Sequence, residues 1–255
     1  DLPETVQWLT NSEKELLTNR LRRDNPVPTL GEVKFSWHQI KNVFIDLNVY
    51  IYAFIYFGNI TSANFLSLYL PSIIKTMGYS EGTAQLLSVP PYVLACFTTI
   101  IVSFIAGRRN ERGYHIGLFL FISIIGYILL ITLTAYNSIA LYLIICITCT
   151  STYTTITLIL SWCTSNVGCG SRTKRAVAIC VVIGFGNISG ILTPYVSCSQ
   201  SYTRGNIISL IFMCCSFLVV LLLKLRLKYE NRRRQNLTRE QYISEESLAT
   251  DLSDL

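Results

Sequence analysis

Long apolar segments alternate with short polar links over most of this 255-residue chain. Six of these segments approach the ~20 residues that an α-helix needs to cross the hydrocarbon core of a bilayer. They cover residues 44–70, 84–106, 114–134, 139–161, 175–197 and 206–228. A helix satisfies all of its backbone hydrogen bonds within one span, and runs this long lack the punctuation of strands. The pattern therefore predicts an all-α integral membrane protein, with six transmembrane helices over residues 44–228.

Basic residues mark one side of the predicted bundle. They cluster before the first span, in the second and fourth links and after the last span: Lys34, Lys41, Arg108, Arg109, Arg112, Arg172, Lys174, Arg175, Lys224, Arg226, Lys228 and Arg232 to Arg234. The alternate links hold only Lys75, no base, and Arg204. Cytoplasmic loops carry an excess of Lys and Arg, so both ends are predicted to be cytoplasmic. Residues 229–255 begin basic, end acidic and rich in serine, and are predicted to be a disordered cytoplasmic tail.

The composition agrees with a bilayer protein. Hydrophobic residues make up 51% of the chain and charged residues only 14%, whereas soluble domains carry about a quarter charged residues. The net charge of +6 sits in short clusters beside apolar runs, which does not favour a nucleic-acid surface. The nine cysteines lie mostly within apolar runs, and the CITC spacing lacks a second ligand pair for zinc. No metal, cofactor or catalytic constellation is predicted.

The first span carries neutral polar residues that a simple anchor does not need. Asn48, Tyr52, Tyr56 and Asn59 follow the spacing i, i+4, i+8, i+11 and would line one helix face. Such a stripe favours a helix that lines a wet cavity. The fourth span, with TCTSTYTTIT, is similar, although Ser and Thr can also bond their own helix backbone. The motif VPPY predicts a kink in the second span.

The fifth span contains the glycine-rich stretch GFGNISGIL, residues 184–192. It lacks the third glycine and the preceding strand of a dinucleotide fingerprint. Gly186 and Gly190 stand four residues apart, a spacing that predicts close helix packing on one face. Asn187 lies beside that face, and an amide within a bilayer needs a hydrogen-bond partner. A neighbouring helix and a bound ligand are both open as that partner.

The motifs, taken in order, resemble the carboxy-terminal half of a major facilitator superfamily transporter. More narrowly, they are similar to the fungal allantoate permease branch of the anion:cation symporters. The resemblance rests on LPETVQWLTNSEKELL, FLSLYLPSIIKTMGYSEGTAQLLSVPPYVLA, GRRNERG, SWCTSN, TKRA, GFGNISGILTPY and YTRG. The chain departs from the family where Ala106-Gly107-Arg108 replaces Ser-Asp-Arg, and where the stretch between Asn166 and Lys174 is about two residues longer.

The resemblance implies twelve spans in two six-span halves, with alternating access and a substrate site between the halves. Residues 1–43 would then be a cytoplasmic central-loop segment. The expected activity is proton-coupled symport of a small organic anion across the plasma membrane. With no buried base in this half, the counter-charge for the anion, and the proton-carrying acid, would come from the amino-terminal half.

Site residues follow from the same resemblance, by position in this sequence. The expected substrate contacts are Tyr56, Asn59, Asn64 and Asn187, and more weakly Asn48 and Tyr52. The bases that match the cytoplasmic gating loops are Arg108, Arg112, Lys174 and Arg175. The chain begins at Asp1 without a methionine and is interpreted as a piece of something longer. The alternative is a truncated or non-transporting membrane protein, or a half that pairs with a separate amino-terminal half.

Overall fold

The computed structural model describes residues 37–109, 111–132, 138–167, 172–191 and 202–235, together with Thr10 and Thr193. The helices in these ranges are α2 (Trp37–Ile45), α3 (Leu47–Thr76), α4 (Glu81–Leu87), α5 (Val89–Arg109), α6 (Arg112–Thr132), α7 (Ser138–Val167), α8 (Arg172–Asn187) and α10 (Tyr202–Gln235). Outside the described residues lie positions 1–36 of the predicted segment 1–43, apart from Thr10, the tail beyond residue 235, the lengthened link at 168–171 and the end of the fifth predicted span.

Helix starts follow from local sequence. Asp46 is extended and accepts a hydrogen bond from the Asn48 backbone N–H, so it caps α3 and separates it from α2. Ser80 caps α4 in the same way. The predicted kink in the second span takes the form of a break at Ser88, after which α5 begins with the VPP stretch. Proline suits the first turn of a helix because its missing N–H has no intrahelical partner there.

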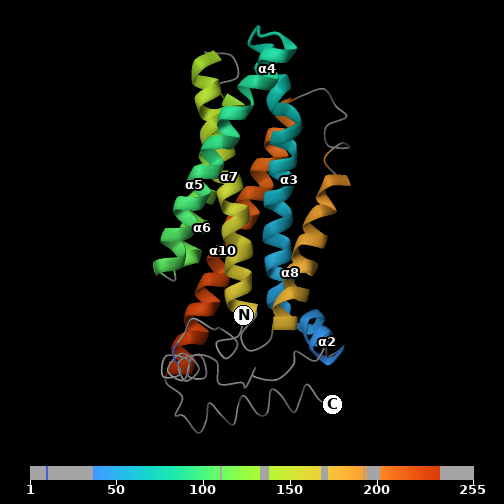
Figure 1. Cartoon of the computed structure of the whole chain (residues 1–255), viewed down its shortest axis with the longest axis vertical. Helices are drawn as coiled ribbons and strands as arrows, with labels where there is room; N and C mark the ends of the chain where they lie inside the picture. Colours follow the sequence, from blue (N-terminus) through green and yellow to red (C-terminus); the bar gives the residue numbers. More distant parts are fainter. Residues whose placement is uncertain are drawn as a thin grey trace.

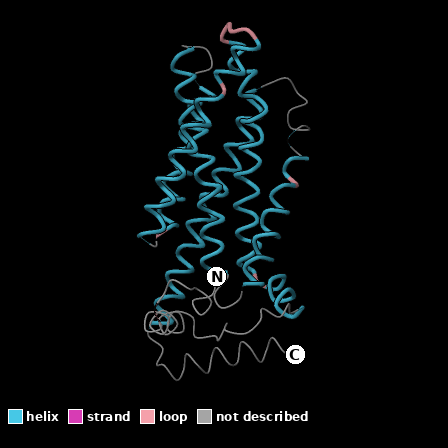
Figure 2. Tube along the Cα trace, in the orientation of Figure 1, coloured by secondary structure: helices cyan, strands magenta, loops and turns pink. Residues whose placement is uncertain are grey.

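The long helices pack side by side in one bundle (Figure 1). Helix α3 lies at the centre, against α7, α8 and α10, while α6 packs on α7 and α10, and α5 packs on α7. The short α2 lies below the start of α3 and α8 and is turned away from their direction. The turn between α3 and α4 and the break at Ser88 are short, and they are among the pink segments of Figure 2.

Five helices within the described ranges are long and apolar enough to cross a membrane: Glu81–Arg109, Arg112–Thr132, Ser138–Val167, Thr173–Ile191 and Thr203–Glu230. They overlap five of the six predicted spans, and the prediction of an all-helical membrane protein is confirmed for the described residues. The remaining segment, 44–70, corresponds to α3. This helix has 30 residues, the same as α7, which gives a length of about 45 Å. Its asparagines and hydroxyl residues make it less apolar than the others, and the count of six spans stays a prediction.

The clustered bases gather at one end of the bundle, which we call the basic end. It contains α2, the junction of α5 with α6, the start of α8 and the end of α10 (Figure 1). Arg108, Arg112 and Lys174 therefore lie at this end, and Lys75 and Arg204 at the opposite one. Helix α10 continues to Gln235, beyond the predicted end of the bundle at residue 228.

Candidate functional site

The predicted polar face of α3 is packed inside the bundle. Tyr52 is fully buried, and its hydroxyl accepts a hydrogen bond of 2.7 Å from the Asn166 amide of α7. The ring of Tyr52 also stands edge-on to Trp162, with ring centroids 5.3 Å apart. Tyr52 thus holds α3 against α7 at the basic end. Of the predicted stripe, Tyr52, Tyr56 and Asn59 are buried and Asn48 is half-buried. Neighbouring helices cover the three buried residues, so this face does not line the open cavity that the spacing favoured.

Asn59 lies deeper on the same face and is also fully buried. Its Nδ2 donates to the Ile55 carbonyl at 2.9 Å, whereas its Oδ1 accepts no hydrogen bond from the described residues. Leaving a buried acceptor unsatisfied costs about 1–3 kcal/mol. Asn59 therefore carries a buried, unsatisfied acceptor in the middle of α3.

Close packing joins α3 to α8 at the glycine-rich stretch. Gly186 is buried, and the Tyr56 ring lies where a Cβ at this position would project. Asn64 donates through Nδ2 to the Ser189 hydroxyl at 3.3 Å. A Cβ at Gly190 would be 3.9 Å from the same Nδ2, which is ordinary contact. The helices approach closely because glycine has no side chain at residue 186.

Asn187 and Asn48 lie apart from these contacts. Asn187 is exposed at the end of α8, about 100° around the helix axis from Gly186. Phe185 lies about 100° the other way and contacts Phe57, with ring centroids 5.6 Å apart. Asn187 therefore projects on the opposite side of α8 from the contact between Phe185 and Phe57. Asn48 is half-buried in the first turn of α3, where its backbone N–H meets the Asp46 cap.

A tyrosine pair that the sequence analysis did not select lies where α3, α5 and α7 meet. The rings of Tyr92 on α5 and Tyr153 on α7 stand edge to face, with centroids 5.5 Å apart, and both are half-buried. The exposed Ser67 of α3 lies within hydrogen-bonding reach of Tyr92. We call Ser67, Tyr92 and Tyr153 the tyrosine cluster. Tyr92 belongs to the motif VPPY, and Tyr153 belongs to TCTSTYTTIT. The sequence signal that could have identified them was a tyrosine within each of these two motifs.

Most hydroxyl groups of α7 bond within the protein. Thr148, Ser151, Thr152 and Thr155 donate to carbonyls one turn earlier in their own helix. Two pairs of hydroxyl groups also join α7 to its neighbours: Thr152 lies 3.0 Å from Ser123 of α6, and Thr154 lies 3.1 Å from Thr99 of α5. The polarity of TCTSTYTTIT is thus used mainly for helix backbone bonds and helix packing. Tyr153 differs, because its ring lies against α5 and is partly exposed.

The four predicted gating-loop bases divide into two pairs at the basic end. Arg112 is half-buried and donates from Nη1 to the Ser161 carbonyl of α7 at 2.6 Å. Lys174 of α8 forms an ion pair with Asp46, with Nζ 3.4 Å from Oδ2. Arg108 and Arg175 have exposed side chains. The first pair ties helices of this bundle together, while the second lies at its surface.

The expectation that this half has no buried base needs one correction. Lys224 of α10 is half-buried, and its Nζ lies over the ring of Tyr114 on α6. A cation is attracted to the face of an aromatic ring, which explains how the ammonium is accommodated there. The site is at the basic end, on the α6–α10 side of the bundle, so Lys224 does not join the tyrosine cluster.

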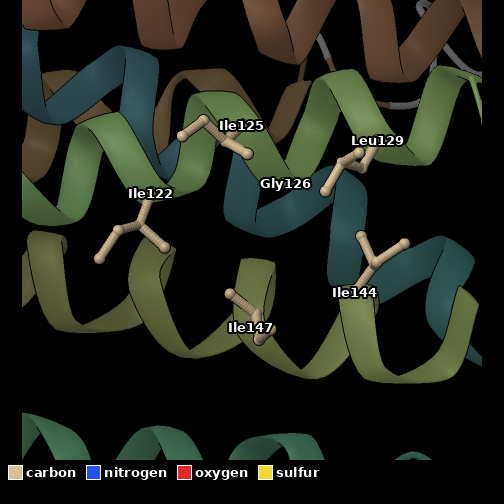
Figure 3. A pocket seen from close by; sticks show the side chains of 6 residues that line it. All are labelled: Ile122, Ile125, Gly126, Leu129, Ile144 and Ile147. Atoms are coloured by element: carbon tan, nitrogen blue, oxygen red, sulfur yellow. The ribbon is translucent and has the colours of Figure 1, made fainter. Parts of the chain in front are cut away.

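An apolar pocket lies between α6 and α7 (Figure 3). Its lining comes from hydrocarbon side chains around Gly126: Ile122, Ile125, Leu129, Ile144 and Ile147. Gly126 allows this approach because a Cβ there would meet the Thr148 side chain. The lining offers no hydrogen-bonding side chain to a polar solute. No group of three or more His, Cys, Asp or Glu residues able to hold a metal occurs among the described residues.

The bundle of apolar helices with a buried polar interior defines a multi-pass integral membrane protein. The family comparison makes the class specific, because residues 5–194 match the model of the Major Facilitator Superfamily. The chain belongs to this superfamily.

Curated relatives are named as transporters. An uncharacterized transporter of Schizosaccharomyces pombe is 31% identical over 91% of this chain and 46% of its own length. The MFS transporter prlL of a fungal species is 30% identical over 92% of this chain and 47% of its own length. The high-affinity nicotinic acid transporter of Saccharomyces cerevisiae is 27% identical over 89% of this chain and 42% of its own length. The chain spans about half the length of the curated relatives it matches.

Proposed function

We propose that the chain forms the carboxy-terminal six-helix half of a secondary transporter. The complete protein would carry a small organic anion across the plasma membrane together with a proton. Membership of the superfamily and relatives twice as long support the two-half organisation. The alternation of helix ends supports six spans, with α3 as the first, and the bases at one end support a cytoplasmic basic end.

The tyrosine cluster is the observation that carries the proposed substrate site. Three helices bring two phenols and a hydroxyl together, with each of the three side chains at least partly exposed. Polar groups so placed are costly in a membrane unless water or a ligand uses them. We assign ligand contact to Tyr92 and Tyr153, and with them to Asn64 and Asn187 from the expected set. Hydroxyl and amide donors in a poorly hydrated site hold an anion strongly.

The buried residues of the expected set take a supporting role in this proposal. Tyr52 and Tyr56 pack against α7 and α8, and so set the position of α3 beside the tyrosine cluster. A shift of α3 would expose the unsatisfied Oδ1 of Asn59 to water or would give it a hydrogen-bond donor. Asn48 belongs to the cap of α3.

The positive charge that binds the anion, and the acidic group that carries the proton, would come from the amino-terminal half. Between Leu47 and Leu223 the acids are Glu81, at the start of α4, and Glu111, in the link between α5 and α6. A proton relay at depth usually needs a carboxylate or histidine. The exposed Arg108 and Arg175 would then face the loops of the other half at the basic end.

Uptake by the complete transporter tests the proposal. Radiolabelled nicotinate heads a panel of small organic anions, because a relative is named for nicotinic acid. Uptake of an anion that rises as the external pH falls is the expected result. Uptake that is indifferent to every anion and to the proton gradient would instead support the non-transporting alternative.

A variant pair tests the site. Tyr153→Phe removes one hydroxyl and keeps the ring, and a hydrogen bond to a charged group contributes about 1.5–3 kcal/mol. The apparent KM should therefore rise about tenfold or more at unchanged surface expression. The matched control is Tyr229→Phe, which removes the same group from an exposed tyrosine at the end of α10. Equal KM values for the two variants would place the substrate away from the tyrosine cluster.

A further inference from the structure

Helix α2 exposes an apolar face that the bundle does not cover. Trp37, Phe44 and Ile45 are exposed by 73%, 52% and 78%, whereas Val43 is fully buried in the core. The exposed three follow the spacing i, i+7, i+8, which places them on one side of a helix. Lys41 is exposed between them in the sequence, at i+4 from Trp37. Three large apolar side chains of α2 therefore face away from the protein, where a soluble protein would usually place polar ones.

The position of α2 is fixed by specific contacts. Asp46 follows it directly, caps α3 and pairs with Lys174 of α8. The Tyr50 hydroxyl of α3 donates to the Phe44 carbonyl at 2.8 Å and thus ties the end of α2 to the first turns of α3. The helix also packs on α8 at the basic end of the bundle (Figure 1). Its exposed side chains are therefore held at a defined level relative to the spans.

That level is where the apolar surface of α3 begins. Leu47 and Tyr50, in the first turns of α3, are also exposed, so the apolar face of α2 continues onto the outer surface of the bundle. Tryptophan and tyrosine favour the boundary between hydrocarbon and headgroups, because their rings are apolar and one end is polar. A lysine at the same level attracts anionic headgroups.

We propose that α2 is an interfacial helix that binds the bilayer surface at the basic end. Trp37, Phe44 and Ile45 insert at the boundary between headgroups and acyl chains, and Lys41 contacts anionic headgroups. The occupant of this face is the lipid leaflet that already surrounds the spans, since the two apolar surfaces are continuous. This membrane anchor does not depend on any transport activity of the protein.

Quenching of Trp37 fluorescence by brominated lipids tests the proposal in the full polypeptide, reconstituted in vesicles. The difference between the protein and its Trp37→Phe variant isolates the signal of Trp37 from the other two tryptophans. Lipids brominated near the headgroup end of the acyl chain should reduce this signal about twofold, and aqueous iodide should quench it weakly. Strong iodide quenching without lipid quenching would overturn the proposal. Quenching by neither agent would also overturn it, because protein would then cover the face.

Two further variants separate insertion from general damage. Replacing Phe44 and Ile45 with serine should shift Trp37 emission toward longer wavelength and halve the lipid quenching or reduce it further. Leu222→Ser, at an exposed apolar position of α10, should leave both unchanged. Lys41→Gln should remove the gain in lipid quenching that anionic phosphatidylserine vesicles give over neutral phosphatidylcholine ones. An identical response of Lys41→Gln and the parent protein to phosphatidylserine would remove the headgroup contact from the proposal.

Discussion

Gly186 and Gly184 lie on the same helix, and the same substitution at each should have opposite effects. At Gly186 an added Cβ would meet the Tyr56 ring, including its Cγ at 3.6 Å and two nearer atoms of the ring. At Gly184 nothing lies within 4 Å of the added Cβ. The pair therefore measures how tightly α8 packs on α3, with helix, residue type and membrane environment held constant.

The magnitudes follow from two terms. Replacing glycine with alanine within a helix contributes about 0.5–1 kcal/mol of stability. This term applies to both sites and cancels in the difference between them. Forcing a methyl group into a packed contact costs about 1–3 kcal/mol, because the aromatic ring must shift against its own neighbours. Gly186→Ala should therefore be less stable than Gly184→Ala by about 1–3 kcal/mol, which is roughly a 5–150-fold change in the ratio of folded to unfolded protein.

The free energy of unfolding of the two variants, measured in the same lipid nanodiscs, tests this difference. A double variant, Gly186→Ala with Tyr56→Ala, supplies the coupling between the two positions. Removing the ring should relieve the overlap, so the two substitutions together should cost less than the sum of their separate effects. Equal stability of the two single variants would refute the close approach of α8 to Tyr56, as would strict additivity in the double-mutant cycle.

Substitutions at three other positions give separate checks on the bundle. Tyr52→Phe removes the hydroxyl that accepts from Asn166 and should lower the unfolding free energy by about 1 kcal/mol, and a loss below the error of denaturant titration would contradict this bond. Asp46→Asn keeps a good cap for α3 but removes the charge that pairs with Lys174, so the loss should stay below about 1 kcal/mol and disappear in high salt. Ser80→Ala removes the cap of α4 and should cost about 1 kcal/mol, whereas Ser80→Asp should retain most of the stability in thermal denaturation.

Span positions were predictable because they depend on local properties. An apolar run of helical length is recognisable without knowledge of its neighbours, and so is a cluster of bases at its end. Helix α3 was the exception to simple hydropathy. Its polar side chains lower its apolar character, yet its length equals that of α7 and it lies at the centre of the bundle.

The candidate site was less predictable because it depends on which face meets which neighbour. Spacing correctly placed Tyr52, Tyr56 and Asn59 on one side of α3, but it contains no information about what covers that side. Trp162 and Gly186 come from distant parts of the chain, and they fill the space that the polar stripe was expected to leave open.

The sequence alone was sufficient to predict an α-helical membrane protein, the order of its spans and a basic end, because lipid selects residues by composition over each segment. Tertiary structure alone decided the pairing of Tyr92 with Tyr153 and the outward turn of Trp37 on α2. Those outcomes depend on the rotation of each helix about its own axis. That rotation is set by close contacts such as Gly186 against Tyr56, which form between residues far apart in the sequence.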